Sequence, residues 1–159
     1  MICRSKFLAL SLLALSIGLG ACSSNDDEEL RLSGGVDNFA IQPEYQEFCT
    51  TYDSLTIALN EMSDNGTTKE NFAVVLEKSK ALVAASPDDI ADAVLSNDAI
   101  LNAMNKAFAD RNFDASKISE DEGLRQEVQA LYAREGVAEL TTSFANYLVK
   151  NCGVSTEKK

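Results

Sequence analysis

Residues 86–89 read Ser-Pro-Asp-Asp and form the clearest boundary between two helices in this chain. Serine is a favoured N-cap, proline suits the first helical position because its missing N–H is not needed there, and acids are stabilised near the positive end of the helix dipole. The pattern predicts that one helix ends at Ser86 and that the next begins at Pro87. Apolar residues then follow at helical spacing: Ile90, Val94, Leu101, Met104 and Phe108.

Two further helices are predicted on the N-terminal side of this boundary. The nearer one opens with Thr67 and Glu70, which have the spacing of a capping box. The first helix begins near Pro43 and ends within 63–66. Its apolar residues recur at intervals of three and four, as expected for an amphipathic helix: Tyr45, Phe48, Cys49, Tyr52, Leu55, Leu59 and Met62.

A fourth helix is predicted on the C-terminal side, after a connection at 111–114. Ser119 and Glu122 form a second capping-box spacing, and Gly153 suits a helix C-cap. The apolar register shifts near Gly136, which predicts a kink or a break there. Because apolar stripes of helical period recur and no useful stretch alternates with period two, the fold class is an all-α, up-and-down bundle of about four helices.

The N-terminus has the layout of a secretory signal. Arg4 and Lys6 precede an apolar run at 7–17. This run is short for a membrane-spanning helix. The alternative is a permanent anchor helix that continues through 18–21. The next residues, Leu19-Gly20-Ala21-Cys22, resemble the lipobox of bacterial lipoproteins. The resemblance implies a cleaved signal peptide at 1–21 and lipidation of Cys22. The predicted remainder is a polar, acidic tether at 22–42, a helical domain at 43–153 and a polar tail at 154–159.

The four cysteines divide between these segments. Cys3 lies in the signal and Cys22 is the expected lipid site, so Cys49 and Cys152 remain as a pair in an oxidising, exported setting. We predict that they form a disulfide; two free buried thiols are the alternative. In an antiparallel bundle the start of the first helix meets the end of the last one only if the number of full-length helices is even.

Composition excludes several function classes. The chain has no histidine, the commonest general base and metal ligand, and the segment after the signal carries 12 basic and 25 acidic residues, a net charge of −13. An acidic protein is a poor partner for nucleic acid. No metal, cofactor or catalytic residue is predicted. Two pairs of acidic residues have the four-residue spacing that places both members on one helix face: Asp88 with Asp92, and Glu135 with Glu139. We interpret both pairs as part of a solvated acidic surface.

The domain also resembles secreted and lipid-anchored helical proteins of actinobacteria. The shared landmarks are Phe48-Cys49, the 86–89 quartet, and a closing pattern from Tyr147 to Cys152-Gly153. The resemblance implies a disulfide-clasped helical lipoprotein and no particular chemistry.

These observations predict a lipoprotein on the extracytoplasmic face of a bacterial cell membrane. Its domain is expected to be a non-enzymatic interaction module whose partner is an envelope protein or polymer. The alternative is a carrier of a small ligand or lipid, which requires an enclosed apolar cavity inside the bundle.

Overall fold

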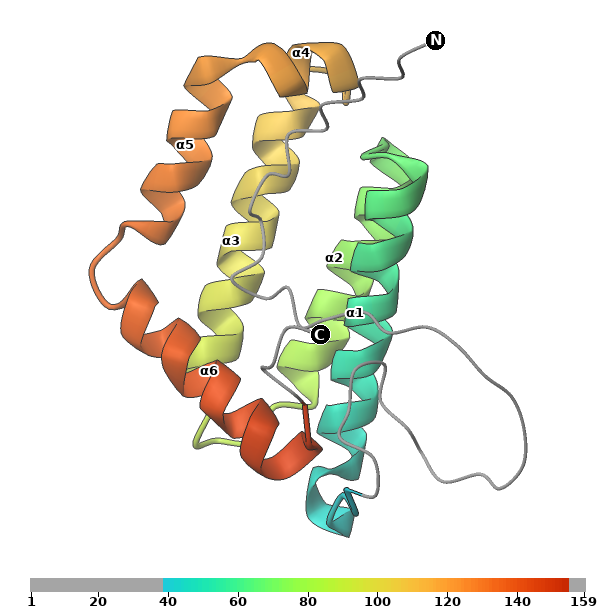
Figure 1. The fold of residues 1–159 in the computed structure, drawn as a ribbon, viewed down its shortest axis with the longest axis vertical. Coiled ribbons are helices and arrows are strands. Elements are labelled where there is room, and N and C mark those ends of the chain that lie inside the picture. Colours follow the sequence, from blue (N-terminus) through green and yellow to red (C-terminus); the bar gives the residue numbers. More distant parts are fainter. Residues whose placement is uncertain (1–38, 155–159) are drawn as a thin grey trace, which may run out of the picture.

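The computed structural model describes residues 39–154, except for the side chains of residues 115, 116 and 119. The predicted all-α class is confirmed for this part of the chain, which contains helices and no strand (Figure 1). A 3-10 helix precedes the α-helices, and the elements in chain order are η1 Pro43–Tyr45, α1 Gln46–Asn65, α2 Lys69–Ala84, α3 Ala91–Ala109, α4 Ala115–Glu120, α5 Glu122–Tyr132 and α6 Val137–Cys152.

The first three long helices run antiparallel along the long axis of the bundle (Figure 1). α1 packs against α2, and α2 packs against α3. α4 lies at the far end of α3, after which α5 returns along α3 and α6 runs obliquely to the start of α1 (Figure 1). The chain therefore begins and ends its helical course at the same end of the bundle.

The expected number of about four helices is wrong, because the predicted fourth helix is two helices, α5 and α6. Within 39–154 there are five helices of 11 residues or more, together with the six-residue α4. The break predicted near Gly136 is confirmed: this glycine has a left-handed φ of 80° and directly precedes α6. Because α5 and α6 run one after the other toward the same end, together they complete a single return path, which brings Cys152 back to Cys49.

The helix starts differ from the predicted ones. Pro43 opens η1, and α1 begins only at Gln46. The N-cap of α2 is Thr68, whose hydroxyl accepts a hydrogen bond from the backbone N–H of Asn71, so the Thr67 capping box is wrong. Likewise the N-cap of α5 is Asp121 and not Ser119. In both cases the capping residue has the extended backbone that aims its side-chain oxygen at the helix N–H groups.

The 86–89 quartet separates two helices as predicted, but its residues act differently. The Ser86 hydroxyl donates to the carbonyl of Val83 at 2.8 Å, so it satisfies the C-terminal end of α2 rather than capping α3. The N–H of Ile90 donates to the carbonyl of Pro87 in a tight turn. Ile90 itself has non-helical backbone angles, which delays the start of α3 to Ala91.

The core is continuous along the bundle and contains two aromatic groups. Near one end the ring of Phe72 packs edge-on against Phe108, with centroids 5.5 Å apart. Near the other, Phe48 packs edge-on against Phe144 and Tyr147. Such pairs add about 0.5–1.5 kcal/mol each beyond the burial of apolar area.

A hydrogen bond between helices explains the one serine on the buried face of α2. Ser79 is only 3 % exposed, and its hydroxyl donates to a carboxylate oxygen of Asp98 on α3 at 2.7 Å. The second carboxylate oxygen of Asp98 accepts from the side-chain amide of Asn102. The buried hydroxyl therefore has its partner, as buried polar groups generally do.

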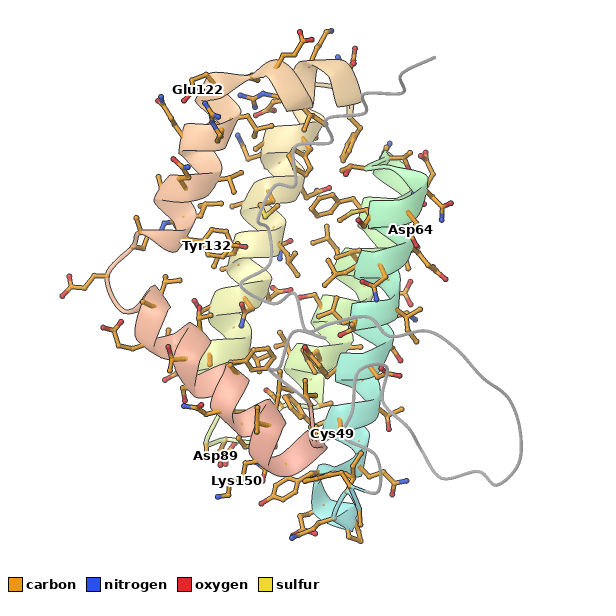
Figure 2. The ribbon with its side chains drawn as sticks, in the orientation of Figure 1. Cys49, Asp64, Asp89, Glu122, Tyr132 and Lys150 are labelled. Atoms are coloured by element: carbon orange, nitrogen blue, oxygen red, sulfur yellow. A yellow bond between two sulfur atoms is a disulfide. The ribbon has the colours of Figure 1, made fainter. Side chains whose placement is uncertain are left out.

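We call the end of the bundle that contains Cys49 the disulfide pole, comprising residues 39–49, 86–90 and 147–154. The opposite end, comprising residues 62–69 and 108–124, is the distal pole. Figure 2 places Cys49 and Asp89 at the disulfide pole and Glu122 at the distal pole.

Candidate functional site

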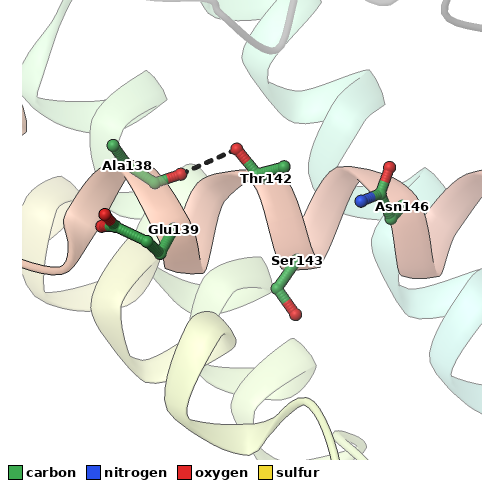
Figure 3. A pocket seen from close by; sticks show the side chains of 5 residues that line it. All are labelled: Ala138, Glu139, Thr142, Ser143 and Asn146. Atoms are coloured by element: carbon green, nitrogen blue, oxygen red, sulfur yellow. Dashed lines mark hydrogen bonds between the residues drawn. The ribbon is translucent and has the colours of Figure 1, made fainter.

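A depression on the outer face of α6 is the most conventional candidate for a ligand site (Figure 3). It is wide open to solvent, and its lining side chains all come from α6: Ala138, Glu139, Thr142, Ser143 and Asn146. The hydroxyl of Thr142 donates to the carbonyl of Ala138 within the helix, so that donor is already used. Groups on one exposed helix face do not converge on a ligand, and this depression is not the enclosed apolar cavity that a carrier requires.

The acidic pairs do not occupy the positions that their spacing predicted. Asp88 lies in the turn before α3, while Asp92 lies in the first turn of that helix. Glu135 lies in the connection before Gly136, and Glu139 lies beyond it in α6. Neither pair therefore shares one continuous helix face, and all four side chains are exposed. The predicted faces are wrong because helix breaks fall inside both spacings.

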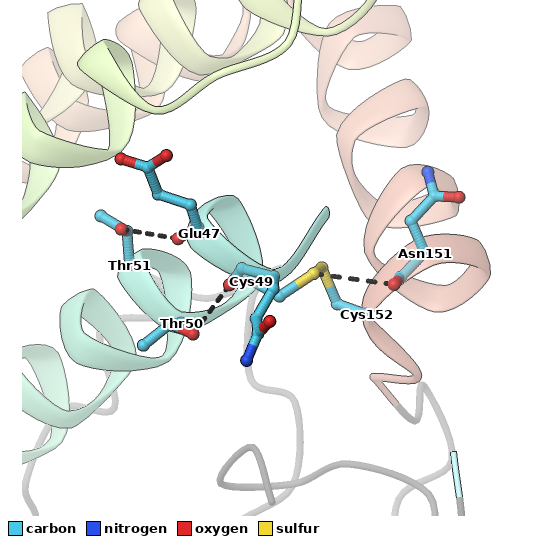
Figure 4. Close-up of a disulfide and its surroundings, with 7 residues drawn as sticks. Glu47, Cys49, Thr50, Thr51, Asn151 and Cys152 are labelled. Carbon is cyan, nitrogen blue, oxygen red and sulfur yellow. Dashed lines mark hydrogen bonds between the residues drawn. A yellow bond between two sulfur atoms is a disulfide. The ribbon is translucent and has the colours of Figure 1, made fainter. Parts of the chain in front are cut away.

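The disulfide pole is built around the predicted disulfide, which is confirmed. Cys49 in the first turn of α1 is bonded to Cys152, the last residue of α6, with their Cα atoms 5.4 Å apart (Figure 4). Both residues are fully buried. The Sγ of Cys49 also lies 3.6 Å from the carbonyl oxygen of Asn151, a packing contact because a disulfide sulfur carries no proton. The bond joins the first and last long helices at one point.

Residues on both sides of the helical domain also meet at this pole. Gly153 has a left-handed φ of 65° and forms the C-cap of α6, as predicted. The ring of Phe39 covers it so closely that a Cβ at Gly153 would overlap the ring. Ile41 packs against the core, and Val154 is buried within it. Phe39 and Ile41 therefore lie against the domain, and the chain enters and leaves the bundle side by side.

Tyr147 contributes a buried polar group to the same pole. Its ring packs edge-on against Tyr45 and Phe48, and only 8 % of the residue is exposed. Its hydroxyl has no partner at hydrogen-bonding geometry in the described part of the chain. The pKa of Tyr147 is raised to about 12, chiefly by burial and to a smaller extent by the negative charge of Asp89. The hydroxyl is therefore neutral at physiological pH.

Two other tyrosines are also stabilised in their neutral form. Burial raises the pKa of Tyr52 to about 12, while the side chain of Thr56 acts in the opposite direction. Burial also raises the pKa of Tyr132. Burial in the core is the largest cause of both shifts, and the negative charge of Asp53 adds to that of Tyr52.

The distal pole is held by an arginine at the end of α3. The Nε of Arg111 lies 2.6 Å from a carboxylate oxygen of Asp121, and one of its terminal nitrogens lies 3.6 Å from Glu127. Asp121 also accepts a hydrogen bond from the backbone N–H of Leu124, so it caps α5 while it binds Arg111. The hydrogen bond to Arg111 lowers the pKa of Asp121, and the same bond raises the pKa of Arg111. Sequence patterns did not identify this contact.

Within 39–154 there is no group of three or more histidine, cysteine, aspartate or glutamate side chains that could hold a metal ion. No helix among these residues is long and apolar enough to cross a membrane. The predicted signal peptide at 1–21, the lipid site Cys22 and most of the tether lie outside the described residues.

Comparison of the chain with models of known protein families, with curated proteins and with solved structures finds no match.

Proposed function

We propose that this protein is a lipoprotein anchored through Cys22 to the extracytoplasmic face of a bacterial cell membrane, and that its helical domain is a non-enzymatic interaction module. One observation carries the proposal: the chain enters and leaves the bundle at the disulfide pole, where Phe39 covers Gly153. A lipid at Cys22 would hold the domain by that pole. The distal pole would then be free to point away from the membrane.

The dimensions suit display of the domain above a membrane. Sixteen residues separate Cys22 from Phe39, and a flexible chain of that length has an r.m.s. reach of about 20–25 Å. α1 adds about 30 Å between the two poles. Tethering of this kind raises the effective concentration of a surface-bound partner to roughly the millimolar range, so recognition does not require tight intrinsic affinity. The net negative charge would also keep the domain away from anionic headgroups.

The anchor is tested by metabolic labelling with a palmitate analogue. Cys22→Ser should abolish incorporation and release the protein from membranes or leave it unprocessed. Cys3→Ser is the matched control, because it removes the other cysteine of the predicted signal region and should leave labelling unchanged. Equal labelling of the wild type and Cys22→Ser would contradict the anchor.

The non-enzymatic role is tested by rescue of a deletion strain. Two double variants should each restore the wild-type phenotype: Asp88→Asn with Asp92→Asn, and Glu135→Gln with Glu139→Gln. All four carboxylates are exposed, and neither pair shares a continuous helix face. Native capture from membranes with the anchored protein as bait should enrich an envelope protein or polymer. If one of these changes abolishes function while the fold and partner binding persist, the domain is an enzyme and the proposal is wrong.

A further inference from the structure

α5 is attached to the bundle more weakly than the other long helices. It packs mainly against α3, whereas α6 packs against both α3 and α1. Its apolar face has three buried residues, Leu124, Val128 and Leu131. Most of its other residues are polar and exposed, and the ion pair of Glu122 with Arg125 stays within the helix surface.

The two halves of the return path are held in different ways. α6 ends at Cys152 and is covalently joined to α1. α5 has no covalent link to the bundle, and the break at residues 133–136 interrupts the helical hydrogen bonds between it and α6. Gly136, at φ 80°, provides a position where the backbone can change direction without steric cost from a side chain. Movement of α5 therefore does not require movement of α6.

The other end of α5 lies at the distal pole, where Arg111 pairs with the N-cap Asp121 and with Glu127 of α5, next to a strained turn. Asn112 and Phe113 both have left-handed backbone angles, with φ of 55° and 54°, which are unfavourable for residues with a Cβ. The Phe113 ring packs against Phe72, with centroids 6.3 Å apart. Arg111 binds the carboxylate of Asp121, the N-cap residue of α5. The same carboxylate therefore forms the ion pair with Arg111 and accepts the capping hydrogen bond of α5.

We propose that α5 is a flap that opens as a unit from α3 while α1, α2, α3 and α6 stay folded, with Arg111 and Asp121 as its latch. Opening exposes the apolar face formed by Leu124, Val128 and Leu131. The disulfide keeps the rest of the bundle closed during this motion. Local opening of this kind is expected where few buried apolar contacts hold an element in place.

Thiol labelling under native conditions tests the flap in the full chain with Cys3 and Cys22 replaced by serine and the disulfide intact. Val128→Cys places a thiol on the buried face of α5, and Val75→Cys places one on the buried face of α2. Both changes are small, and circular dichroism checks that each variant folds. The thiol at 128 should react with a maleimide at least tenfold faster than the thiol at 75, which becomes accessible only when the whole domain unfolds. Equal rates would overturn the proposal.

The latch is tested in the Val128→Cys background. Asp121→Asn removes the charge that binds Arg111 but keeps a side-chain oxygen able to cap α5. It should accelerate labelling at 128 several-fold without changing labelling at 75. Glu122→Gln is the matched control, since its partner Arg125 lies on α5 itself, and it should leave both rates unchanged. If Asp121→Asn changes both rates equally, or neither, Asp121 is not a latch.

Discussion

Reduction of the disulfide is predicted to lower the melting temperature while leaving the helices formed at 25 °C. The bond closes a loop with a sequence separation of 103 residues, so in the chain-entropy model it destabilises the unfolded state by about 4.7 kcal/mol. For a domain of this size, the melting temperature falls by roughly 4 °C for each kcal/mol lost from the free energy of unfolding. Loss of the bond should therefore lower the midpoint by roughly 15–20 °C. The helices persist at 25 °C because their packing does not depend on the bond.

Thermal unfolding followed by circular dichroism at 222 nm measures this shift. The full chain with Cys3 and Cys22 replaced by serine is compared in oxidised and reduced form, and the reduced thiols preserve the volume of the buried site. The double variant Cys49→Ala with Cys152→Ala should melt near the reduced form and should not respond to reductant. A shift below about 5 °C would refute the entropic reasoning. Loss of helical signal at 25 °C would show that the bundle needs the covalent clasp in order to fold.

Three further predictions concern glycine conformation and buried hydroxyls. Gly153→Ala and Gly136→Ala should each lower the free energy of unfolding by about 1–2 kcal/mol, because both positions have positive φ. Urea unfolding should show the larger loss for Gly153→Ala, because its Cβ meets the ring of Phe39. This excess should vanish in a Phe39→Ala background. Tyr147→Phe removes a buried hydroxyl that has no partner of good hydrogen-bond geometry within 39–154, so the free energy of unfolding should stay constant or rise by up to about 1 kcal/mol. A loss of about 1 kcal/mol would show that the hydroxyl is bonded, with the side chain of Asn151 as the nearby candidate. The pKa of Tyr52 is about 12 in the folded chain against 10.0 as the ordinary value, so the unfolded chain loses this proton first as pH rises. Its contribution to stability should be constant below pH 10 and should fall by about 2 kcal/mol between pH 10 and 12. Denaturation across that range should show this loss, and Tyr52→Phe should remove it.

The helices of this domain were predictable because apolar spacing is a property of the local sequence. The stripes in α1, α2 and α3 place their buried residues on one face whatever they pack against. Helix starts were less predictable because the chain offers several residues able to cap within a short distance. Thr67 and Thr68 are adjacent, and Ser119 and Asp121 are two apart. Thr68 and Asp121, which cap, both have extended backbone, whereas Ser119 lies inside α4, and these placements depend on how the preceding segment packs.

Of the candidate site, the disulfide was predictable and its surroundings were not. After the expected loss of Cys3 and lipidation of Cys22, a single pairing remained for the other two cysteines. The burial of the Tyr147 hydroxyl has no sequence signature, because a tyrosine at a helical position indicates only a core residue. The acidic pairs were misplaced because a spacing of four residues shares a face only where the helix is continuous.

By itself, the sequence determined the helical class, the break at Gly136, the Cys49–Cys152 pair and the expectation of an anchor at Cys22, because periodicity, backbone freedom and residue inventory are local properties. The tertiary structure alone decided that Ser86 closes α2, that Arg111 binds the N-cap of α5, and that Phe39 covers Gly153. It also decided that the return path divides into α6, which is joined covalently to α1, and α5, which is held by a short apolar face and the ion pairs of Arg111. These features depend on which helices lie side by side, and packing between distant segments leaves no periodic signal in either one.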